Sequence, residues 1–281
     1  MSPHRIQELR SALAKLDRYT DDYWIPSLES RKKKELEFHD RYRDLGQIEK
    51  LNEDAYERFY GNEKYYAATR SSKEYVDRWI GRETNGQIFL DYCCGNGYYA
   101  LLAAKAGAKL AIGLDLSSVS IANARTSAQK IGVSESTCFV QADAENTGLP
   151  ENSVDRVICS GVLHHLDLTP AFKELYRIMV PGGKLMAIEA LNYNPAIRLY
   201  RHLTPQMRTE WEKAHILTLR EVESAKKFFE VGEIRFWHIL GILEPHFPRL
   251  GNIFQALDSL LTRIPGVQLM AWMFTFELIK R

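Results

Sequence analysis

The chain has 281 residues, a formal net charge of +1 and a sequence pI near 7.7. Hydrophobic residues make up 45% and aromatic residues 11% of it, which excludes an intrinsically disordered protein. The near-zero net charge gives no electrostatic reason to expect DNA or RNA as a partner, and the length allows one large domain or one domain with a cap.

The amino terminus and the cysteines predict a cytoplasmic protein. Residues Met1–Ile6 open an amphipathic helix and do not resemble a signal peptide, and no apolar run approaches the roughly 18 residues of a membrane span. The spacing of the cysteines suits neither a disulfide framework nor a zinc site. They are Cys93, Cys94, Cys138 and Cys159.

Residues 1–85 are expected to be helical and to form an N-terminal cap. Apolar residues recur at helical spacing from Ile6 to Leu16. The mixed charges of Glu29–Asp44 predict a solvated helix face. Two further helices are expected, one from near Asn52 to Gly61 and one capped by Ser71 or Ser72 and ending at Gly81.

From residue 86 to residue 190, strands and helices alternate, which predicts a Rossmann-like, doubly wound parallel sheet. Helices are expected from Tyr98, after a Ser117 cap and from Thr169-Pro170, and Pro181-Gly182-Gly183 is expected to turn into the fifth strand. Ligands of such sheets bind beyond the carboxyl ends of the strands. The expected strands are Ile88–Cys93, Leu110–Leu114, Thr137–Gln141, Val154–Ser160 and Lys184–Glu189.

Residues 191–230 are predicted to form a helical insertion, and two more strands are expected after it. Asn194-Pro195, Thr204-Pro205 and the capping box Thr218-x-x-Glu221 mark helix starts. The β-leaning runs Val231–His238 and Leu269–Lys280 flank a helix around Ile253–Leu261, and the last run is expected to pair antiparallel. The predicted domain therefore covers residues 86–281.

A glycine-rich turn and three acids define the candidate ligand site. Gly95-x-Gly97-x-x-Ala100 satisfies the dinucleotide-binding pattern, and Asp115 at the end of the second strand suits a ribose diol. Asp143 would suit an exocyclic adenine amine. Asp91 lies inside the turn, where a carboxylate would repel a diphosphate but attract an ammonium or a sulfonium. That charge argument favours S-adenosylmethionine over NAD.

The order of these motifs resembles class I S-adenosylmethionine-dependent methyltransferases, and within them the small-molecule enzymes of the ubiquinone and menaquinone biosynthesis type. The matching stretches are Leu90–Gly97, Asp115, Asp143, Ser160–Leu166 and Leu175–Leu185. The resemblance covers residues 86–190 well, is weaker over 191–281 and says little about 1–85. One position departs from the family's Asp/Glu-x-Gly-x-Gly-x-Gly, because Cys93 replaces the first glycine; a packed thiol is the plainer interpretation of it.

The resemblance implies a seven-stranded sheet with an antiparallel last strand, and it implies a role for each matching residue. Asp91, Gly95, Gly97 and the backbone at Cys93 would hold the methionine part of the donor. Asp115 would take the ribose and Leu116 would pack on the adenine, whose edge Asp143 and the backbone N–H of Ala144 would recognise. The backbone of Ser160 would face the donor's amino group. The expected product is S-adenosylhomocysteine.

Methyl transfer requires the nucleophile and the methyl group in line, and a base only where the acceptor must lose a proton. The candidate bases are His164, His165 and Glu189, each of which has a plainer structural interpretation: a loop cap for a histidine, and a hydrogen-bond partner of the following loop for Glu189. No third ligand lies at metal spacing from the two histidines, so no metal is expected.

A small-molecule acceptor is favoured over a protein or nucleic acid. The sequence after the fourth strand is Ser160-Gly-Val-Leu, whereas enzymes that methylate amide or adenine nitrogens in these polymers usually carry Asn-Pro-Pro-Tyr there. Aromatic and histidine side chains of the cap and the insertion would enclose the acceptor, although each is as readily explained as core. They are Tyr60, Tyr65, Tyr66, Tyr193, Tyr200, His202 and Trp211.

Two alternatives stay open from the sequence, as does the choice between a monomer and a homodimer. One alternative is an NAD(P)-dependent oxidoreductase, although the only Tyr-x-x-x-Lys, Tyr60–Lys64, precedes the nucleotide-binding strand. The other is a methyltransferase-like subunit that binds the cofactor without catalysis.

Overall fold

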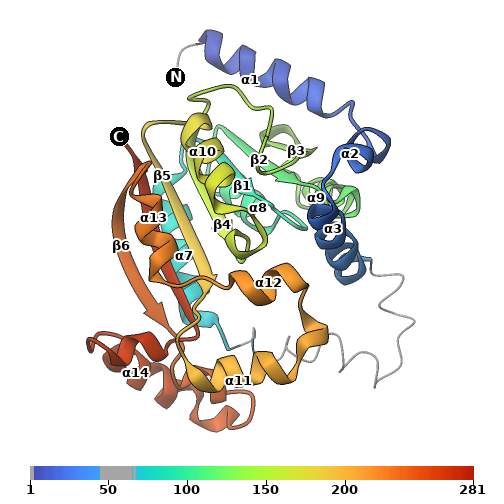
Figure 1. Ribbon diagram of the computed structural model, residues 1–281. Coiled ribbons are helices and arrows are strands. Elements are labelled where there is room, and N and C mark those ends of the chain that lie inside the picture. The colour runs from blue at the N-terminus through green and yellow to red at the C-terminus, as the bar shows by residue number, and fades with distance from the viewer. Residues whose placement is uncertain (1–2, 45–64, 66–67) are drawn as a thin grey trace.

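The computed structural model describes residues 3–44, 65 and 68–281 (Figure 1). Its centre is a seven-stranded sheet in the order β3-β2-β1-β4-β5-β7-β6. The first five strands are parallel, and β7 pairs antiparallel with both β5 and β6. The strands are β1 (Ile88–Tyr92), β2 (Leu110–Asp115), β3 (Thr137–Gln141), β4 (Val154–Ser160), β5 (Met179–Ala190), β6 (Phe229–Trp237) and β7 (Met273–Lys280).

The strand order reverses at β1, which lies between β2 and β4. β1 and β2 are buried along their whole length, as expected for parallel strands covered on both faces. The connections that leave β1 and β4 therefore depart to opposite sides and open a crevice beyond the carboxyl ends of the strands. The predicted parallel, doubly wound sheet with an antiparallel last strand is confirmed.

Helices cover both faces of the sheet (Figure 1). On one face, α7 (Arg70–Glu83), α8 (Tyr98–Lys105) and α9 (Ser118–Ile131) share an apolar cluster with the sheet. On the other face, α1 (Pro3–Leu16), α10 (Leu168–Ile178) and α13 (Leu219–Ala225) contribute to the second cluster. α1 and α7 therefore pack as covering helices of the sheet, and α2 (Asp21–Ser27) leads into α3 (Ser30–Arg43) at the strand ends.

Several helix starts differ from the sequence prediction. α7 begins at Arg70, so Ser72 lies inside the helix, where its hydroxyl bonds the carbonyl of Thr69 and the ring of His238. Asp167, and not Thr169, caps α10 by accepting from the Thr169 N–H. At α10, a carboxylate two positions before Thr169 therefore provides the cap, whereas no side chain caps α7. The helix predicted from near Asn52 to Gly61 lies outside the described residues.

Pro181-Gly182-Gly183 also departs from prediction, because it lies within β5 and does not precede it. The register between β4 and β5 shifts between Val154 and Arg156, so the strand accommodates these residues as an irregularity and continues. Thr204-Pro205 begins only a short 3-10 turn, Pro205–Met207.

The segment after β5 carries α11 (Pro195–Leu203), α12 (Glu210–His215), α13 and, between β6 and β7, α14 (Gly251–Leu261). Asn194 caps α11, and Thr218 with Glu221 forms the predicted capping box of α13. No helix within the described residues is long and apolar enough to cross a membrane.

Gly97 holds the turn between β1 and α8 in a conformation that a side chain would oppose. Its φ is +81°, and a β-carbon placed on it would lie 2.7 Å from Cε1 of Phe139 and 2.8 Å from Cβ of Ala124. Gly132, the C-cap of α9, has a similar φ of +72° but no atom within 4 Å of such a carbon. Comparing substitutions at Gly97 and Gly132 therefore distinguishes the cost of backbone strain, which both would have, from that of steric overlap, which only Gly97 would have.

We expect Gly132→Ala to lower the free energy of unfolding by about 1–2 kcal/mol, because the left-handed backbone alone opposes it. Gly97→Ala should lower it by a further 1–3 kcal/mol or so, because the added methyl also overpacks the contact with Phe139. Urea denaturation of the two variants measures the difference. Equal losses would show that Phe139 moves aside freely.

Candidate active site

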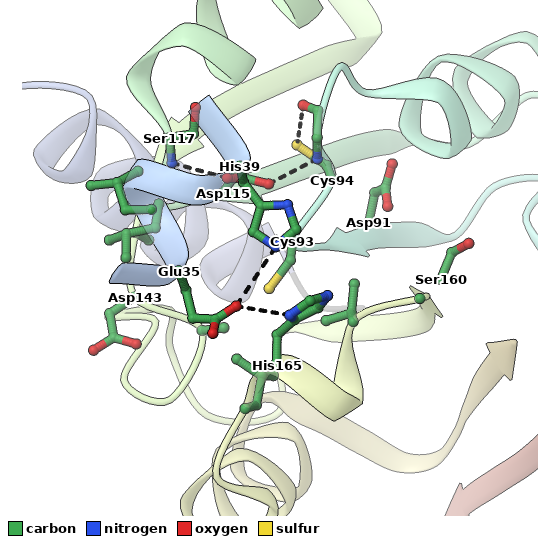
Figure 2. Close-up of a pocket in the computed structure, with 18 of the residues that line it drawn as sticks. Glu35, His39, Asp91, Cys93, Cys94, Asp115, Ser117, Asp143, Ser160 and His165 are labelled. Atoms are coloured by element: carbon green, nitrogen blue, oxygen red, sulfur yellow. Dashed lines mark hydrogen bonds and ion pairs between the residues drawn. The ribbon is translucent and has the colours of Figure 1, made fainter. Parts of the chain in front are cut away.

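A cavity of about 270 Å³ lies at the carboxyl ends of the strands (Figure 2). All of the predicted donor-binding residues line it except Gly97, which supports the turn from behind by packing on Phe139. The lining residues among them are Asp91, Cys93, Gly95, Asp115, Leu116, Asp143, Ala144 and Ser160. The strand-end pattern in the sequence therefore brings these residues to one place.

Asp91, near the end of β1, is a buried acid that forms no ion pair with any residue that the structure describes. It is 2% exposed, and Oδ2 accepts from the Ala100 N–H at 3.0 Å. Burial raises the pKa of this carboxyl to about 8, and the negative charge of nearby Asp115 adds to the shift. A cation in the cavity would favour its ionised form.

Cys93 has a φ of +57°, in the left-handed region where glycine is favoured. This conformation gives a physical reason for the glycine in the motif that this stretch resembles. Burial raises the pKa of the Cys93 thiol well above its usual range, so the group is a thiol and not a reactive thiolate.

Asp115 organises the turn around it. Its Oδ2 accepts from the Gly95 N–H at 2.8 Å and its Oδ1 accepts from the Ser117 N–H at 2.9 Å. Nη1 of Arg43, from α3, lies 3.2 Å from Oδ1. The carboxylate is thus fixed by two backbone donors and already paired with a cation.

The charged helix α3 enters the cavity, which corrects the prediction that its charges form a solvated face. Nζ of Lys32 lies 2.6 Å from Oδ2 of Asp143, and Arg43 pairs with Asp115. Lys32, Glu35, His39 and Arg43 all line the cavity. Their spacing of three or four residues places them on one side of a helix, which is the sequence signal that could have identified them.

His165 meets two residues of α3. Its Nδ1 lies 2.8 Å from Oε2 of Glu35, and the same oxygen lies 3.7 Å from Nε2 of His39 (Figure 2). Ligand atoms of these three residues lie within 4.8 Å of one another, so the group has the composition of a metal site. The imidazoles already satisfy one carboxylate oxygen, and we propose no metal there. Burial lowers the pKa of His39 well below its usual range.

His164 and Glu189 form a second, buried pair. Nδ1 of His164 lies 2.6 Å from Oε2 of Glu189, and Oε1 accepts from the N–H groups of Val162 and Leu163, each at 2.8 Å. Glu189 has no exposed surface. Glu189 therefore holds both the loop that follows β4 and the ring of His164. The sequence had suggested that it would bond the loop after β5, the strand in which it lies.

A second cavity, of about 670 Å³, adjoins the first, because His39, Gly161 and His165 line both. Its other walls come from α11, the turn after β6 and the start of β7, and include His164, Tyr65 and Tyr200. Most of the remaining lining is apolar, from Phe38, Ile197, Met207, Ile216, Ile239, Ile242, Leu243, Trp272 and Met273.

The structure does not bring the other predicted acceptor-side residues into this cavity. The Tyr193 hydroxyl accepts from the Leu219 N–H at 3.1 Å, and His202 lines a separate surface hollow. Trp211 stacks on His215, with Arg31 over its ring. These placements follow from contacts and packing that aromatic composition alone could not predict. Tyr60 and Tyr66 lie outside the described residues.

Comparisons with known proteins agree with this geometry. Residues 90–187 match the methyltransferase domain family. The chain is 30% identical over 151 residues to the sterol 24-C-methyltransferase erg6 of Aspergillus fumigatus, which covers 51% of this chain and 40% of that protein. It is 30% identical over 135 residues to the 2-phytyl-1,4-naphtoquinone methyltransferase of Nostoc punctiforme, covering 47% and 58%.

Solved structures show the same fold. A geranyl diphosphate methyltransferase in complex with GPP and sinefungin superposes with a TM-score of 0.57 at 16% identity, over 75% of this chain and 78% of that one. The [4+2]-cyclase SpnF superposes with a TM-score of 0.53 at 18% identity, over 73% and 80%. The chain contains a class I methyltransferase domain, and it matches about two fifths of the sterol methyltransferase and three fifths of the naphthoquinone one.

Proposed function

We propose that this chain transfers a methyl group from S-adenosylmethionine to a small, largely apolar acceptor. The observation that carries the proposal is the pair of adjoining cavities. The first holds acids suited to a cationic adenosyl donor, and the second is mostly apolar and meets the first at Gly161 and His165. A [4+2]-cyclase shares this fold, so the fold alone does not identify the reaction. The proposal therefore rests on the residues of the two cavities.

The donor would be held by the residues of the first cavity. Asp115 would bind the ribose hydroxyls, Asp143 and the Ala144 backbone the adenine edge, and Asp91 the methionine end. Two of these acids are already paired, Asp115 with Arg43 and Asp143 with Lys32. Donor binding would therefore exchange ion pairs from α3 for hydrogen bonds to the nucleoside. When bound, the donor supplies a methyl group on a sulfonium.

Asp91 supports this donor over a nicotinamide dinucleotide. A buried carboxyl beside the glycine-rich turn would face the diphosphate of NAD(P), which costs repulsion whenever the acid ionises. An ammonium group in the same place would stabilise the carboxylate.

On the acceptor side, His164 is the candidate base and Glu189 its positioning residue. With Nδ1 directed at Glu189, Nε2 is the ring nitrogen left to take a proton from an acceptor in the second cavity. His165, bound to Glu35 between the two cavities, is the other candidate. Helices α3, α11 and α12 supply lining to the two cavities. This supports a cover in residues 191–230 and, within the cap expected over residues 1–85, a covering role for α3, since α1 and α7 pack on the sheet. The catalytic domain would extend over 86–281.

The cysteines and the charge support the remaining parts of the proposal. All four cysteines are free, as expected in a reducing compartment such as the cytoplasm. The net charge of +1 favours a small molecule over nucleic acid as the acceptor.

Incubation with a methyl-labelled donor and an extract of small metabolites and lipids tests the proposal. We expect label in an organic-soluble product that forms together with S-adenosylhomocysteine. Donor binding without transfer to any acceptor class would instead favour the non-catalytic subunit, and hydride transfer from NAD(P)H would favour the oxidoreductase.

Donor affinity should depend on pH through Asp91. Since the pKa of its carboxyl in the free protein is about 8, most molecules must lose a proton to bind an ammonium group at neutral pH. We expect the affinity for S-adenosylhomocysteine to rise by roughly tenfold to a hundredfold between pH 6 and pH 8. Titration calorimetry in buffers of different ionisation enthalpy would detect the released proton.

Asp91→Asn provides the control, because it should bind more weakly at pH 8 and lose the pH dependence. Protein stability should depend on pH in the opposite direction to donor affinity. The raised pKa means that the folded protein retains a proton which the unfolded chain loses near pH 4, so the Asp91 contribution to stability is full below about pH 4, falls as the pH rises to about 8 and stays constant above it. A wild-type affinity that is flat from pH 6 to pH 8 would contradict a carboxylate–ammonium contact.

A further inference from the structure

Large apolar side chains are exposed on α11, on α14 and on the turn before α14. These elements lie at the lower end of the molecule in Figure 1. Single exposed apolar residues are ordinary, but a group of this size on adjacent elements marks an interaction surface. The main members are 43–68% exposed and are called the apolar face below. They are Leu199, Leu203, Phe247, Ile253, Leu257 and Leu260.

Helix α14 packs on the protein by a polar contact and directs its apolar stripe outward. Asp258 is buried, and its carboxylate accepts from the Leu240 N–H at 2.7 Å and the Gly241 N–H at 2.9 Å. Ile253, Leu257 and Leu260, at spacings of four and three residues, are exposed. This reverses the usual amphipathic arrangement, in which the apolar stripe faces the core.

The fully exposed charges on these segments are all positive. Arg198 on α11 and Arg249 and Arg263 beside α14 are exposed. In residues 195–203 and 239–271 the acids are Glu244, which is half-buried, and Asp258, which is buried. Exposed leucine, isoleucine and phenylalanine bordered by arginine match the interface of an anionic bilayer.

The apolar face adjoins the second cavity. Leu243 and His246 line that cavity and are themselves exposed, so it reaches the surface at the turn before α14. The ring of Tyr65 lies 5.7 Å from that of Tyr200 on α11 and 5.8 Å from that of His246. α11 and this turn therefore both line one cavity next to the apolar face.

We propose that the apolar face binds the surface of an anionic phospholipid bilayer, with α14 lying in the interface, and that a lipophilic acceptor enters the second cavity from the membrane. The statement about the acceptor rests on the proposed function, but membrane binding does not. A second copy of the chain fits less well, because a two-fold contact through this face would bring the arginines of both copies together.

Vesicle flotation tests the proposal on the full chain without donor. We expect the wild type to float with vesicles of phosphatidylcholine containing about one third phosphatidylglycerol, to float poorly with phosphatidylcholine alone, and to release in high salt. Leu257→Glu/Leu260→Glu should weaken binding at least tenfold, and Arg249→Gln/Arg263→Gln should remove most of the preference for the anionic lipid.

Ile131→Glu is the matched control, because Ile131 is 40% exposed at the end of α9, away from the apolar face, and should leave binding unchanged. Circular dichroism on the same samples shows whether a variant is folded. Titration with S-adenosylhomocysteine shows whether the donor site is intact, so failure of the proposed function is distinguished from loss of membrane binding. The proposal is overturned if the wild type does not float, if the leucine variant floats equally well, or if light scattering shows a dimer that this variant dissociates while vesicles are not bound.

Discussion

Replacing Asp115 by alanine should weaken the binding of S-adenosylhomocysteine by a hundredfold or more. In the proposed complex the carboxylate accepts from the ribose hydroxyls, and hydrogen bonds to a charged group contribute about 1.5–3 kcal/mol each. Two such bonds correspond to roughly two to four orders of magnitude in affinity. Asp115 also fixes the N–H groups of Gly95 and Ser117, so its loss further loosens the turn. Isothermal titration calorimetry measures the effect.

Two further variants control this experiment. Asp115→Asn keeps the size and one oxygen acceptor and should bind with intermediate affinity. Asp17→Ala removes an exposed acid that pairs with Arg125 outside the cavity, and it should bind like the wild type. Urea denaturation reports whether each variant is folded. A folded Asp115→Ala protein with donor affinity within threefold of the wild type would rule out the ribose assignment.

Glu189→Gln should lower kcat by two to four orders of magnitude while changing donor affinity little. The glutamine oxygen can still accept from the N–H groups of Val162 and Leu163, but its amide would donate to Nδ1 of His164. That hydrogen bond selects the tautomer that carries its proton on Nε2, which then has no free lone pair for the acceptor's proton. The size of the loss is that of a general base.

The kcat is measured with the acceptor that the labelled-donor experiment identifies. Independently of activity, ¹⁵N NMR of the imidazoles reports the tautomer of His164. His164→Asn should show the same loss of kcat, whereas His165→Asn should retain more activity if His165 serves only to hold Glu35. A change of tautomer with an unchanged kcat would show that the acceptor needs no base. An unchanged tautomer would contradict the positioning role of Glu189.

Local sequence patterns predicted the sheet closely. The four strands β1–β4 end within one residue of their predicted bounds, because apolar runs between glycine, proline and capping residues define buried parallel strands. The acids at the strand ends follow from the same pattern, since each is the last polar residue of a buried strand or the first after it. Topology then brings Asp91, Asp115 and Asp143 to one cavity without further information.

Contacts between distant segments could not be predicted in this way. Glu35 and His165 are 130 residues apart, and the charge pattern of α3 matches that of a solvent-exposed helix. Helix α3 differs from a solvent-exposed helix because its cations pair with acids at the carboxyl ends of the strands, Lys32 with Asp143 and Arg43 with Asp115. Similarly, Trp211 looked like an acceptor-side residue by composition, but its ring stacks on His215 within the same helix.

The most direct test of the central claim is a calorimetric titration of the wild-type protein with S-adenosylhomocysteine, repeated in the presence of excess NADH. We expect one binding site per chain for S-adenosylhomocysteine and an affinity that NADH leaves unchanged. Binding of NADH in place of S-adenosylhomocysteine, or competition between the two at equal strength, would contradict the assignment of the first cavity to a cationic adenosyl donor.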